Sequence, residues 1–529
     1  MNPSRAAIFA QGVAALRAGD FSTAERILLT IVEQDEAAHN AWHALSVVAV
    51  RAGLPDIGIE RARRAVALDR RNAEYLNSLG IACTENEELA AAEHAFRRAL
   101  KIKPAFAEGH YNLAKVLRHQ GKLAEALVEY QRAHALEPWA VPAQLGLAAI
   151  YRLHGKPERA LAVLRAAVRD RTPDPDHIPY LVDCIADVEG PDAAIAWLED
   201  LLAGQPDFQQ AHHILGRLLL SVGHWREGWK HFLWRAHRDP ERMRTRPAVL
   251  PERLDGKRVF LRAEEGIGDI LLFLRFAAEL RARGAEIALE LPSELAKLIP
   301  LLADQIVIDK PAACDLPVWI ADLPALLQTD ATPPPLALPA DEARSASAKR
   351  KLAQLGPPPY LGLTWRAGTN VRRARELGAD QAGLRMLLKE ISPALLGQAV
   401  RGWPGTLVSL QRGPAPDELG AIRAAAGVAV HDLAAANDDL RDALALLGQL
   451  DEYVAVVNTN IHLLAGLGRA ARVLAPQPPD WRWMREGESP WFPGFPVYRQ
   501  PPGLDWAEPL TRLREDLLAS AGSLPRARA

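Results

Sequence analysis

A strand, a glycine turn and a helix are predicted by the string AEEGIGDILLFLRF, which begins at Ala263. Gly266 and Gly268 would let the backbone pass close to a ligand, and the first helical turn would present unpaired N–H groups and a positive dipole end. Asp269 lies in that first turn, where we expect it to face a cleft. A carboxylate at this position can simply cap the helix and complement its dipole. The turn therefore predicts a ligand site beside a carboxylate.

Further polar residues follow other predicted strands. Arg366 comes directly after the strand 360–365, and Thr459 and Asn460 open a helix after the strand 452–457. In a parallel sheet, ligands bind outside the carboxyl ends of the strands. These positions are therefore where residues of a cleft belong.

A cluster of cations follows Arg366. The next loop carries Arg372, Arg373 and Arg375, and Lys389 comes after them. An arginine cluster of this kind can be an anion site or an ordinary solvated surface. Arg366, which follows a strand end, is the better candidate for binding an anion.

Strands and helices alternate from Lys257 onward, which predicts parallel sheets covered by helices. The expected strands are 258–263, 286–291, 305–310, 360–365, 406–411, 452–457 and 471–476. A proline-rich stretch at 329–339 interrupts the pattern. Two α/β halves joined by such a hinge, with a ligand cleft between them, describe the bilobal GT-B architecture, and one large doubly wound domain is the alternative.

The N-terminal half repeats every 34 residues between about Arg5 and Arg242. Small residues recur in one register with larger ones, at Ala92, Ala126, Ala160, Ala194 and Gly228 and at Phe96, Tyr130, Leu164, Leu198 and Phe232. About seven units would start near residues 5, 39, 73, 107, 141, 175 and 209. The pattern resembles the tetratricopeptide family, whose helical hairpins complete a core only by stacking. Such a solenoid implies a groove that binds a polypeptide, with a rigid spacer or dimerisation arm as the alternative.

The expected organisation is an α-solenoid followed by an α/β region of two Rossmann-like lobes. Its parts are a solenoid at 5–242, a linker at 243–256, a first lobe at 257–340, a second lobe at 358–506, and a C-terminal helix and tail at 507–529.

Composition excludes several classes of protein. Lys plus Arg number 63 and Asp plus Glu 65, so no overall field would attract nucleic acid or a membrane surface. Cys83, Cys184 and Cys314 are too few for a disulfide framework or a zinc site, and we expect buried thiols. The N-terminus lacks the pattern of a secretion signal, and no apolar run is long enough for a membrane span. We therefore expect a cytoplasmic protein.

Five segments occur in an order that resembles a known family. AEEGIGDILLFLRF, GLTWRAG, LVSLQRG, VVNTN and PDWRWMREGESPWFP follow one another between roughly residues 257 and 506. Together they are similar to the catalytic region of bacterial tetratricopeptide-linked glycosyltransferases related to the lipopolysaccharide heptosyltransferases. The resemblance implies an inverting sugar transfer without a metal, with a nucleotide sugar as co-substrate and no cofactor. The Asp-x-Asp formed by Asp174 and Asp176 lies far away, in the repeats.

The resemblance also implies roles for the two lobes and for individual residues. The first lobe would lie on the acceptor side and the second on the nucleotide-sugar side. Asp269 matches an aspartate proposed as general base, which would take the proton from an acceptor hydroxyl. Cations and helix N-termini would neutralise the leaving phosphate, and Gln411 and Asp432 could touch the base or the ribose. The residues expected to bind the donor are Gly266, Gly268, Arg366, Lys389, Gln411, Asp432, Asn458, Thr459, Asn460 and His462.

Two positions depart from the family pattern. Asn458 stands where many relatives have aspartate, and His462 lies one place before the usual histidine, whose slot holds Leu463. Backbone amides would still hold phosphate, but His462 is equally well explained as a packed side chain. We expect Trp481 and Trp483 to fasten the C-terminal segment to the first lobe, with a place in the donor pocket as the alternative.

The leading hypothesis is a glycosyltransferase that modifies Ser or Thr of a protein bound by the repeats. Flagellin is one candidate acceptor, because long solenoids joined to such catalytic units occur in flagellin glycosylation. One alternative is a non-catalytic scaffold with a degenerate glycosyltransferase region. Another is an enzyme acting on a glycan or lipid-linked acceptor, and a homo-oligomer is left open.

Overall fold

The computed structural model describes residues 3–169, 173–236, 249–263, 266–296, 298, 314–338, 340–367, 389–477, 479–502 and 505–523. The chain divides into two compact units, Met1–Cys184 and Ile185–Ala529. Within the described ranges, no helix combines the length and the apolar character that a membrane span requires.

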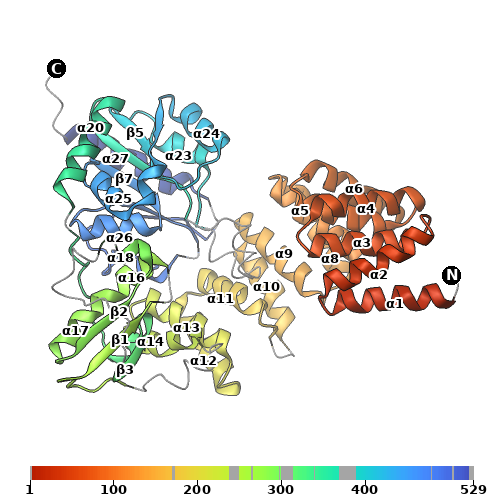
Figure 1. The fold of residues 1–529 in the computed structure, drawn as a ribbon, viewed down its shortest axis with the longest axis horizontal. Helices are drawn as coiled ribbons and strands as arrows, with labels where there is room; N and C mark the ends of the chain where they lie inside the picture. Colours follow the sequence, from red (N-terminus) through yellow and green to blue (C-terminus); the bar gives the residue numbers. More distant parts are fainter. Residues whose placement is uncertain are drawn as a thin grey trace. The chain divides into compact units, whose positions relative to one another are not determined.

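Consecutive helical hairpins form the first unit and continue into the second (Figure 1). The helices are α1 (Pro3–Arg17), α2 (Phe21–Gln34), α3 (His39–Arg51), α4 (Pro55–Leu68), α5 (Ala73–Glu85), α6 (Leu89–Ile102), α7 (Ala107–His119), α8 (Leu123–Leu136), α9 (Val141–Leu153), α10 (Pro157–Val168), α11 (His177–Val188), α12 (Pro191–Gly204), α13 (Gln209–Ser221) and α14 (Trp225–Phe232). These fourteen described helices pair into seven hairpins, which confirms the predicted number of repeats. The boundary between the two units falls within α11.

The small residues of the repeat are required where two helices approach closely. Ala92, Ala126 and Ala160 have no exposed surface. A Cβ added at Gly80 would lie 2.5 Å from a ring carbon of Phe96. Since protein interiors have few voids, a larger side chain at these positions would force the helices apart.

A repeated hydrogen bond is made to the carbonyls of prolines that close several units. The fourth residue of a first helix donates its side-chain N–H to the carbonyl of the proline six residues earlier. The three bonds join His110 to Pro104, Gln144 to Pro138 and His212 to Pro206, at 2.9, 2.7 and 2.7 Å. Each bond satisfies a loop carbonyl, because proline ends one helix and the next has not yet begun.

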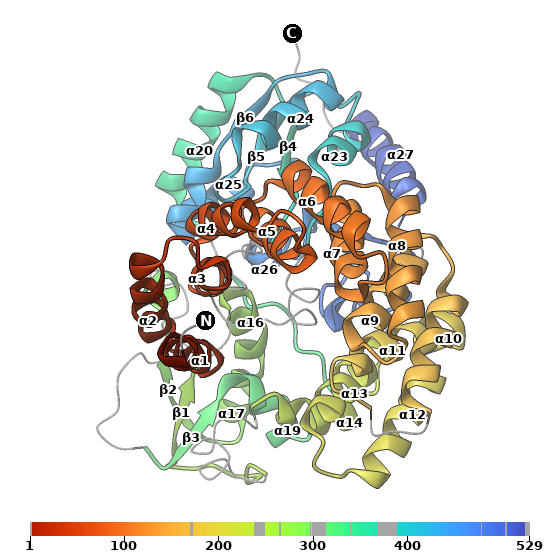
Figure 2. The ribbon, with the colours of Figure 1, turned by 90° about the vertical axis from the view of Figure 1, so that its right-hand side faces the viewer.

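A three-stranded parallel sheet lies in the second unit (Figures 1 and 2). Its order is β2-β1-β3, with β1 at Arg258–Arg262, β2 at Glu286–Glu290 and β3 at Leu316–Trp319. Helices α16 (Ile267–Phe273) and α17 (Ala277–Ala282) connect β1 to β2. The first two predicted strands are confirmed, the predicted strand 305–310 lies outside the described residues, and β3 was not predicted.

A six-stranded parallel sheet forms the other part of this unit. Its order is β6-β5-β4-β7-β8-β9. The strands are β4 (Tyr360–Thr364), β5 (Thr406–Ser409), β6 (Val430–Asp432), β7 (Glu452–Val456), β8 (Arg472–Ala475) and β9 (Val497–Arg499). The helices include α20 (Glu342–Leu355), α23 (Pro393–Ala399), α24 (Pro416–Ala426), α25 (Leu440–Leu447), α26 (Thr459–Gly466) and α27 (Ala507–Ser523). The four strands predicted in this region are confirmed, whereas β6 and β9 are too short to have been recognised.

Strand order reverses at one place in each sheet. The larger sheet runs outward from β4 through β5 to β6 on one side, and from β7 through β8 to β9 on the other. In the smaller sheet, β2 and β3 lie on opposite sides of β1. Loops leave such a reversal in opposite directions and open a crevice at the carboxyl ends of the strands, where open α/β sheets bind ligands. The described strands thus form two parallel sheets, and their assignment to the GT-B architecture stays a prediction.

An aromatic cluster joins the last hairpin to the α/β part of the second unit. The ring of Trp229, on α14, lies 5.2 Å from that of Trp481, 5.9 Å from Trp491 and 6.1 Å from Phe273. All four side chains are buried. Trp481 is therefore a packed side chain, as one of the two expectations had it, but its ring partners Trp229 and Phe232 are on the last hairpin and not in the first lobe.

Polar contacts reinforce the same junction. The backbone N–H of Arg485 donates to the carbonyl of Ser221 at 3.1 Å, and its guanidinium lies 3.6 Å from Asp187. Gln477 donates to the same carboxylate at 2.9 Å. These contacts and the aromatic cluster explain why the compact unit begins near residue 185, two hairpins before the linker expected at 243–256. Part of that linker lies outside the described residues.

One further expectation needs correction. Cys83 and Cys184 are buried in their helices, but Cys314 is exposed. It stands two residues before the edge strand β3.

Candidate functional site

A cavity of about 390 Å³ lies at the carboxyl ends of β4, β5 and β7, within the second unit. We call it the switch-point cavity. The turn after β1 also contributes to its wall. It is lined by Gly266, Ile267, Gly268, Asp269, Thr364, Arg366, Ala367, Lys389, Leu410, Gln411, Arg412, Asn437, Leu440, Val457, Asn458, Thr459, Asn460, His462 and Arg482. Its size suits a small ligand.

The cavity brings together most of the residues expected to form a site. Asp269 and nine of the ten predicted donor-binding residues line it. Asp432 does not: it is exposed at the end of β6 and accepts the N–H of Ala434 at 2.9 Å, closing a local turn. The cluster Arg372, Arg373 and Arg375 lies outside the described residues. What the lining residues bind stays a prediction.

Asp269 belongs to a chain of ion pairs along one wall. Its carboxylate contacts the guanidinium of Arg482, which also binds Asp480 at 2.7 Å, and Asp480 accepts from Lys389 at 2.8 Å. The side chain of Asp269 keeps 31% of its surface exposed, whereas Arg482 and Asp480 keep 10% each. The accessible carboxylate of Asp269 thus lies at the solvent-exposed end of this chain of ion pairs.

The ion pairs keep Asp480 ionised. Burial acts to raise the pKa of this carboxyl, but the charge of Lys389 and its hydrogen bond, together with Arg217 and the backbone of Arg482, lower it further than burial raises it. A buried carboxylate this well paired holds Arg482 in a fixed orientation toward Asp269.

Arg366 is held by the protein itself. Its guanidinium donates to both carboxylate oxygens of Glu418 at 3.0 and 3.1 Å and to the carbonyl of Gly413 at 2.7 Å. Although burial acts to raise the pKa of Glu418, the hydrogen bonds from Arg366 and Ala415 bring it below its usual value. The guanidinium that we expected from the sequence to bind an anion is therefore already paired with a carboxylate of the protein.

Gln411 also has a structural duty. Its side-chain oxygen accepts the backbone N–H groups of Trp365 and Arg366 at 3.1 and 2.9 Å, and only 1% of the residue is exposed. The amide thus fixes the end of β4 instead of offering its oxygen to a base or ribose. The role predicted for this residue needs that correction.

Arg412 is the cation that the sequence argument overlooked. It follows Gln411 in the quoted segment LVSLQRG, is exposed, and lines the cavity. Its guanidinium donates to the carbonyl of Asn437 at 2.6 Å. Among the described residues it makes no ion pair, unlike Arg366, Lys389 and Arg482. Its place directly after the predicted strand 406–411 was the signal that could have identified it.

The start of α26 faces the cavity with a capped first turn. Asn458 accepts the N–H of Ile461 at 3.3 Å, so it fills the N-cap position where an aspartate was expected. Asn460 donates to the side-chain oxygen of Asn437 at 3.0 Å. Thr459 is half-buried in the lining. The substitution of asparagine for aspartate therefore keeps the cap and removes only the charge.

His462 packs directly against the glycine turn. A Cβ added at Gly268 would lie 3.0 Å from its Cδ2 and 3.1 Å from its Nε2. Burial, and then the nearby charge of Arg275, lower the pKa of His462 to about 3. It is therefore a neutral, packed histidine whose Nδ1 has no partner among the described atoms. A side chain at position 268 would therefore press on the histidine ring, whereas a Cβ at Gly266 would contact only Asp269, at 3.6 Å, which is an ordinary van der Waals distance.

A second cavity, of about 420 Å³, lies in the first unit. We call it the first-helix cavity, because α3, α5 and α7, the first helices of three successive hairpins, form it. Its polar groups form two hydrogen-bonded sets: His43 is hydrogen-bonded to Ser78 at 2.7 Å, and Asn77 donates to Glu108 at 3.1 Å. Asn112 donates to Asn77 at 3.0 Å. Amides and hydroxyls in such sets can hydrogen-bond to a polypeptide backbone.

Comparison with known proteins identifies the repeats. One tetratricopeptide-repeat family model matches residues 43–105 and 85–142, and another matches residues 117–177. The chain therefore contains tetratricopeptide repeats, which are protein-interaction modules. Protein FlbA of Caulobacter vibrioides is similar over 535 residues at 26% identity, which covers 93% of this chain and 86% of that protein.

Solved structures also resemble the repeats. The crystal structure of MamA is 25% identical, covering 30% of this chain and 92% of that chain with a TM-score of 0.28. Pseudomonas aeruginosa pilF is 21% identical, covering 40% and 96% with a TM-score of 0.34. The type IV pilus biogenesis factor PilW is 19% identical, covering 41% and 100% with a TM-score of 0.36.

Proposed function

We propose that the second unit is a cytoplasmic glycosyltransferase of GT-B architecture that binds a nucleotide sugar in the switch-point cavity. The observation that carries this proposal is the position of the cavity. It lies at the strand-order reversal of the larger sheet, and four cations and one carboxylate line it. Parallel sheets bind ligands at this position, and a nucleotide leaving group needs cationic stabilisation.

The donor phosphates would be bound by Arg412 and by the first turn of α26. Arg412 has an accessible guanidinium without a carboxylate partner among the described residues. Thr459 offers a hydroxyl and a backbone N–H in the first turn of an eight-residue helix. Together they supply a charge, a dipole end and hydrogen-bond donors to one anion. Arg366 and Lys389 would add a more distant positive field.

Asp269 is the proposed general base. As the acceptor hydroxyl attacks the anomeric carbon, its proton passes to the Asp269 carboxylate and the bond from that carbon to the phosphate oxygen breaks, so the nucleotide leaves with the electron pair. Arg482 favours the ionised carboxylate, which a base requires. The reaction needs no metal, and it inverts the anomeric configuration if a single displacement occurs.

The acceptor is proposed to be a polypeptide bound through the repeats. The first-helix cavity offers the asparagine and serine groups that bind an extended backbone. A Ser or Thr side chain of that polypeptide would receive the sugar, and flagellin is one protein to include among the candidates.

Calorimetry with a panel of nucleoside diphosphates and nucleotide sugars tests donor binding. We expect one class of nucleotide to bind the full chain at a 1:1 ratio. Arg412→Glu should weaken that affinity at least tenfold, about 1.4 kcal/mol, because a charge-assisted hydrogen bond is replaced by repulsion. Arg350→Glu, on the exposed face of α20, makes the same charge change outside the cavity and should bind normally.

The main alternative is a non-catalytic protein-interaction scaffold. It is favoured by the ion pairs that already occupy Arg366, Lys389 and Arg482, and by the uncharged Asn458. If no nucleotide in the panel binds at millimolar concentration, the scaffold is the better account. If one binds equally well to wild type and Arg412→Glu, the donor site has been placed wrongly.

A further inference from the structure

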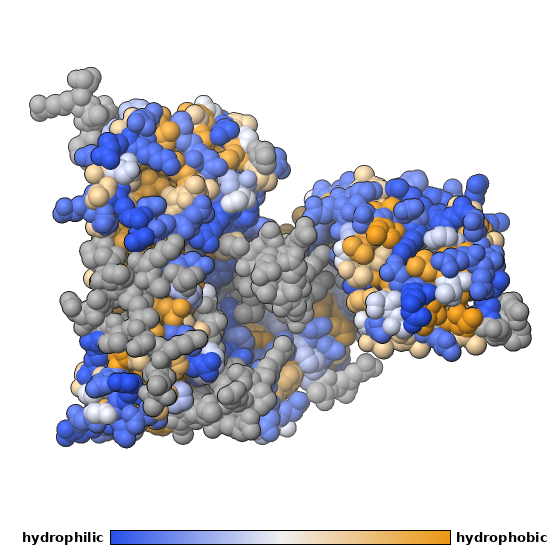
Figure 3. All heavy atoms as spheres, in the orientation of Figure 1, coloured by the Kyte–Doolittle hydropathy of each residue, from blue (hydrophilic) through white to orange (hydrophobic). Residues whose placement is uncertain are grey.

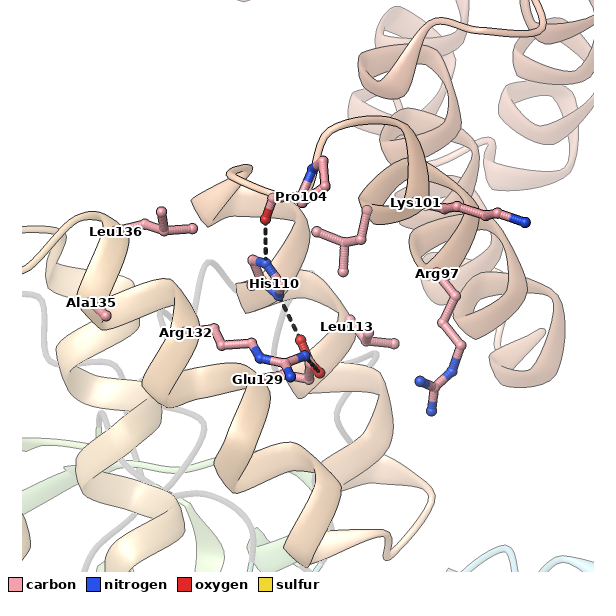
Figure 4. Close-up of a pocket in the computed structure, with 10 residues that line it drawn as sticks. Arg97, Lys101, Pro104, His110, Leu113, Glu129, Arg132, Ala135 and Leu136 are labelled. Carbon is pink, nitrogen blue, oxygen red and sulfur yellow. Dashed lines mark hydrogen bonds and ion pairs between the residues drawn. The ribbon is translucent and has the colours of Figure 1, made fainter.

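A second pocket opens in the first unit, where α6 and α8 line it together with residues of α7. It has a volume of about 600 Å³ and lies between α6 and α8 (Figure 4). We call it the α6–α8 pocket. It shares no lining residue with the first-helix cavity. It is lined by Arg97, Leu100, Lys101, Pro104, His110, Leu113, Glu129, Arg132, Ala135 and Leu136.

The floor of the pocket holds a neutralised acid. His110 donates Nε2–H to the Pro104 carbonyl at 2.9 Å, and its Nδ1 lies 2.6 Å from a carboxylate oxygen of Glu129 (Figure 4). Since a carbonyl only accepts, Nε2 carries hydrogen, so the Nδ1 contact needs one further proton on either partner. The pair is therefore neutral overall, whichever atom holds that proton. Both residues are more than nine-tenths buried.

The rim of the pocket carries positive charge that this acid does not cancel. Arg132 binds Glu129 at 2.7 Å, but Glu129 already shares a proton with His110. Arg97 is compensated by glutamates outside the pocket. Lys101 is exposed and makes no ion pair within the part of the chain that the structure describes. The net charge at the rim is therefore positive, from Arg132 and Lys101.

An apolar row leads away from this rim. Leu68, Ile102 and Leu136 occupy the same position in three successive second helices, and they are 37, 40 and 39% exposed. Trp139, just beyond α8, is 65% exposed. Figure 3 shows that hydrophobic residues reach the surface of this unit in patches among hydrophilic ones. A row across three hairpins is longer than a small anion, which favours a polypeptide as the ligand.

We infer that the α6–α8 pocket docks an acidic, apolar segment of a partner polypeptide, with its carboxylates at Lys101 and Arg132 and its apolar side chains along Leu136 and Ile102. This docking site is separate from the proposed acceptor cavity and does not depend on the proposed transferase activity. Its specificity comes from the combination of charge and apolar contact, because either alone would bind weakly.

The test is fluorescence anisotropy with the full chain and four labelled peptides. The probe alternates aspartate and leucine over six residues between glycine-serine ends. In the others, asparagine or lysine replaces aspartate, or serine replaces leucine. We expect the aspartate-leucine peptide to bind at least fivefold more tightly than the asparagine and serine versions.

Variants of the rim decide the outcome. Lys101→Glu should weaken the aspartate-leucine peptide about tenfold and strengthen the lysine-leucine peptide, because one attraction becomes a repulsion. Lys349→Glu, an exposed lysine on α20, is the matched control and should behave as wild type. Lys101 is on the surface, so a normal circular dichroism spectrum is expected.

Three results would overturn the inference. The first is equal affinity for the aspartate and asparagine peptides. The second is an unchanged preference in Lys101→Glu. The third is a concentration-dependent dimer that Lys101→Glu abolishes in light scattering, which would make a second copy of this chain the occupant.

Discussion

Replacing Trp229 tests whether the last hairpin folds as part of the α/β unit. The side chain is 1% exposed, and its ring lies between 5.2 and 6.4 Å from those of Trp481, Phe232, Trp491, Phe273 and Phe276. Trp→Ala in a packed core typically costs about 3–5 kcal/mol, from lost burial and from the cavity that remains. Because five edge-to-face aromatic partners surround the ring and cannot all move into the space it leaves, we expect a loss of about 4 kcal/mol for Trp229→Ala.

The assay is urea unfolding of the full chain, followed by circular dichroism, with hydrogen exchange to locate the change. A loss of about 4 kcal/mol should appear only in the transition of the second unit. Exchange should rise in α13, α16 and residues 481–499, while α1–α10 keep their protection. Trp139→Ala removes the same side chain from a site that is 65% exposed and should change stability by no more than about 0.5 kcal/mol.

Two outcomes would refute the reasoning about Trp229. A loss below about 1 kcal/mol would mean that the aromatic cluster does not bear on stability. A loss confined to the transition of the first unit would mean that the solenoid folds as one body through α14, with the boundary near residue 243 as the sequence suggested.

Three further substitutions have defined outcomes. Gln411→Ala leaves the N–H groups at the end of β4 unpaired, so it should lower the free energy of unfolding in urea by about 1–3 kcal/mol and also weaken nucleotide binding. Normal stability together with lost binding would instead make Gln411 a direct ligand of the nucleotide. The pKa of His462 falls from 6.5 to about 3 on folding, so between these pH values the unfolded chain binds more protons and the free energy of unfolding decreases as the pH is lowered. From pH 7.5 to 5 the wild type should lose about 2 kcal/mol of unfolding free energy relative to His462→Gln. If the difference in stability between the two proteins does not change with pH, the ring is not buried and neutral. Gly216→Ala places a Cβ 2.6 Å from the backbone nitrogen of Phe232 and should destabilise the protein by more than about 2 kcal/mol. Gly204→Ala has nothing within 4 Å of the added Cβ, so its effect on stability should be neutral or slightly favourable. Equal effects of the two substitutions would show that the helices move apart easily.

The repeats and most strands could be predicted because their signals are local and periodic. The 34-residue period predicted all seven hairpins, since glycine or alanine recurs at equivalent positions of successive repeats. Strands such as β4 and β7 are apolar runs that are buried on both faces. By contrast, β6 and β9 are three residues long and exist only because longer neighbours pair with them.

The candidate site could be predicted in position but not in connectivity. Residues that follow strand ends do meet in one cavity, because parallel strands bring their carboxyl ends to one edge. The partners of Arg366 and Lys389 lie 52 and 91 residues away along the chain, and no local pattern indicates such pairs. For the same reason Arg412, which lacks a carboxylate partner among the described residues, could not be told apart from Arg366.

Transfer of a labelled sugar tests the central claim most directly. Wild type and Asp269→Asn are incubated with the nucleotide sugar that calorimetry selects and with a cell extract as the source of acceptors, and labelled polypeptides are separated by electrophoresis. We expect label on a polypeptide with wild type and at least a hundredfold slower labelling with Asp269→Asn, with equal nucleotide affinity, since the base acts only in the chemical step. Equal labelling by both proteins, or tight donor binding without any labelled product, would contradict the account.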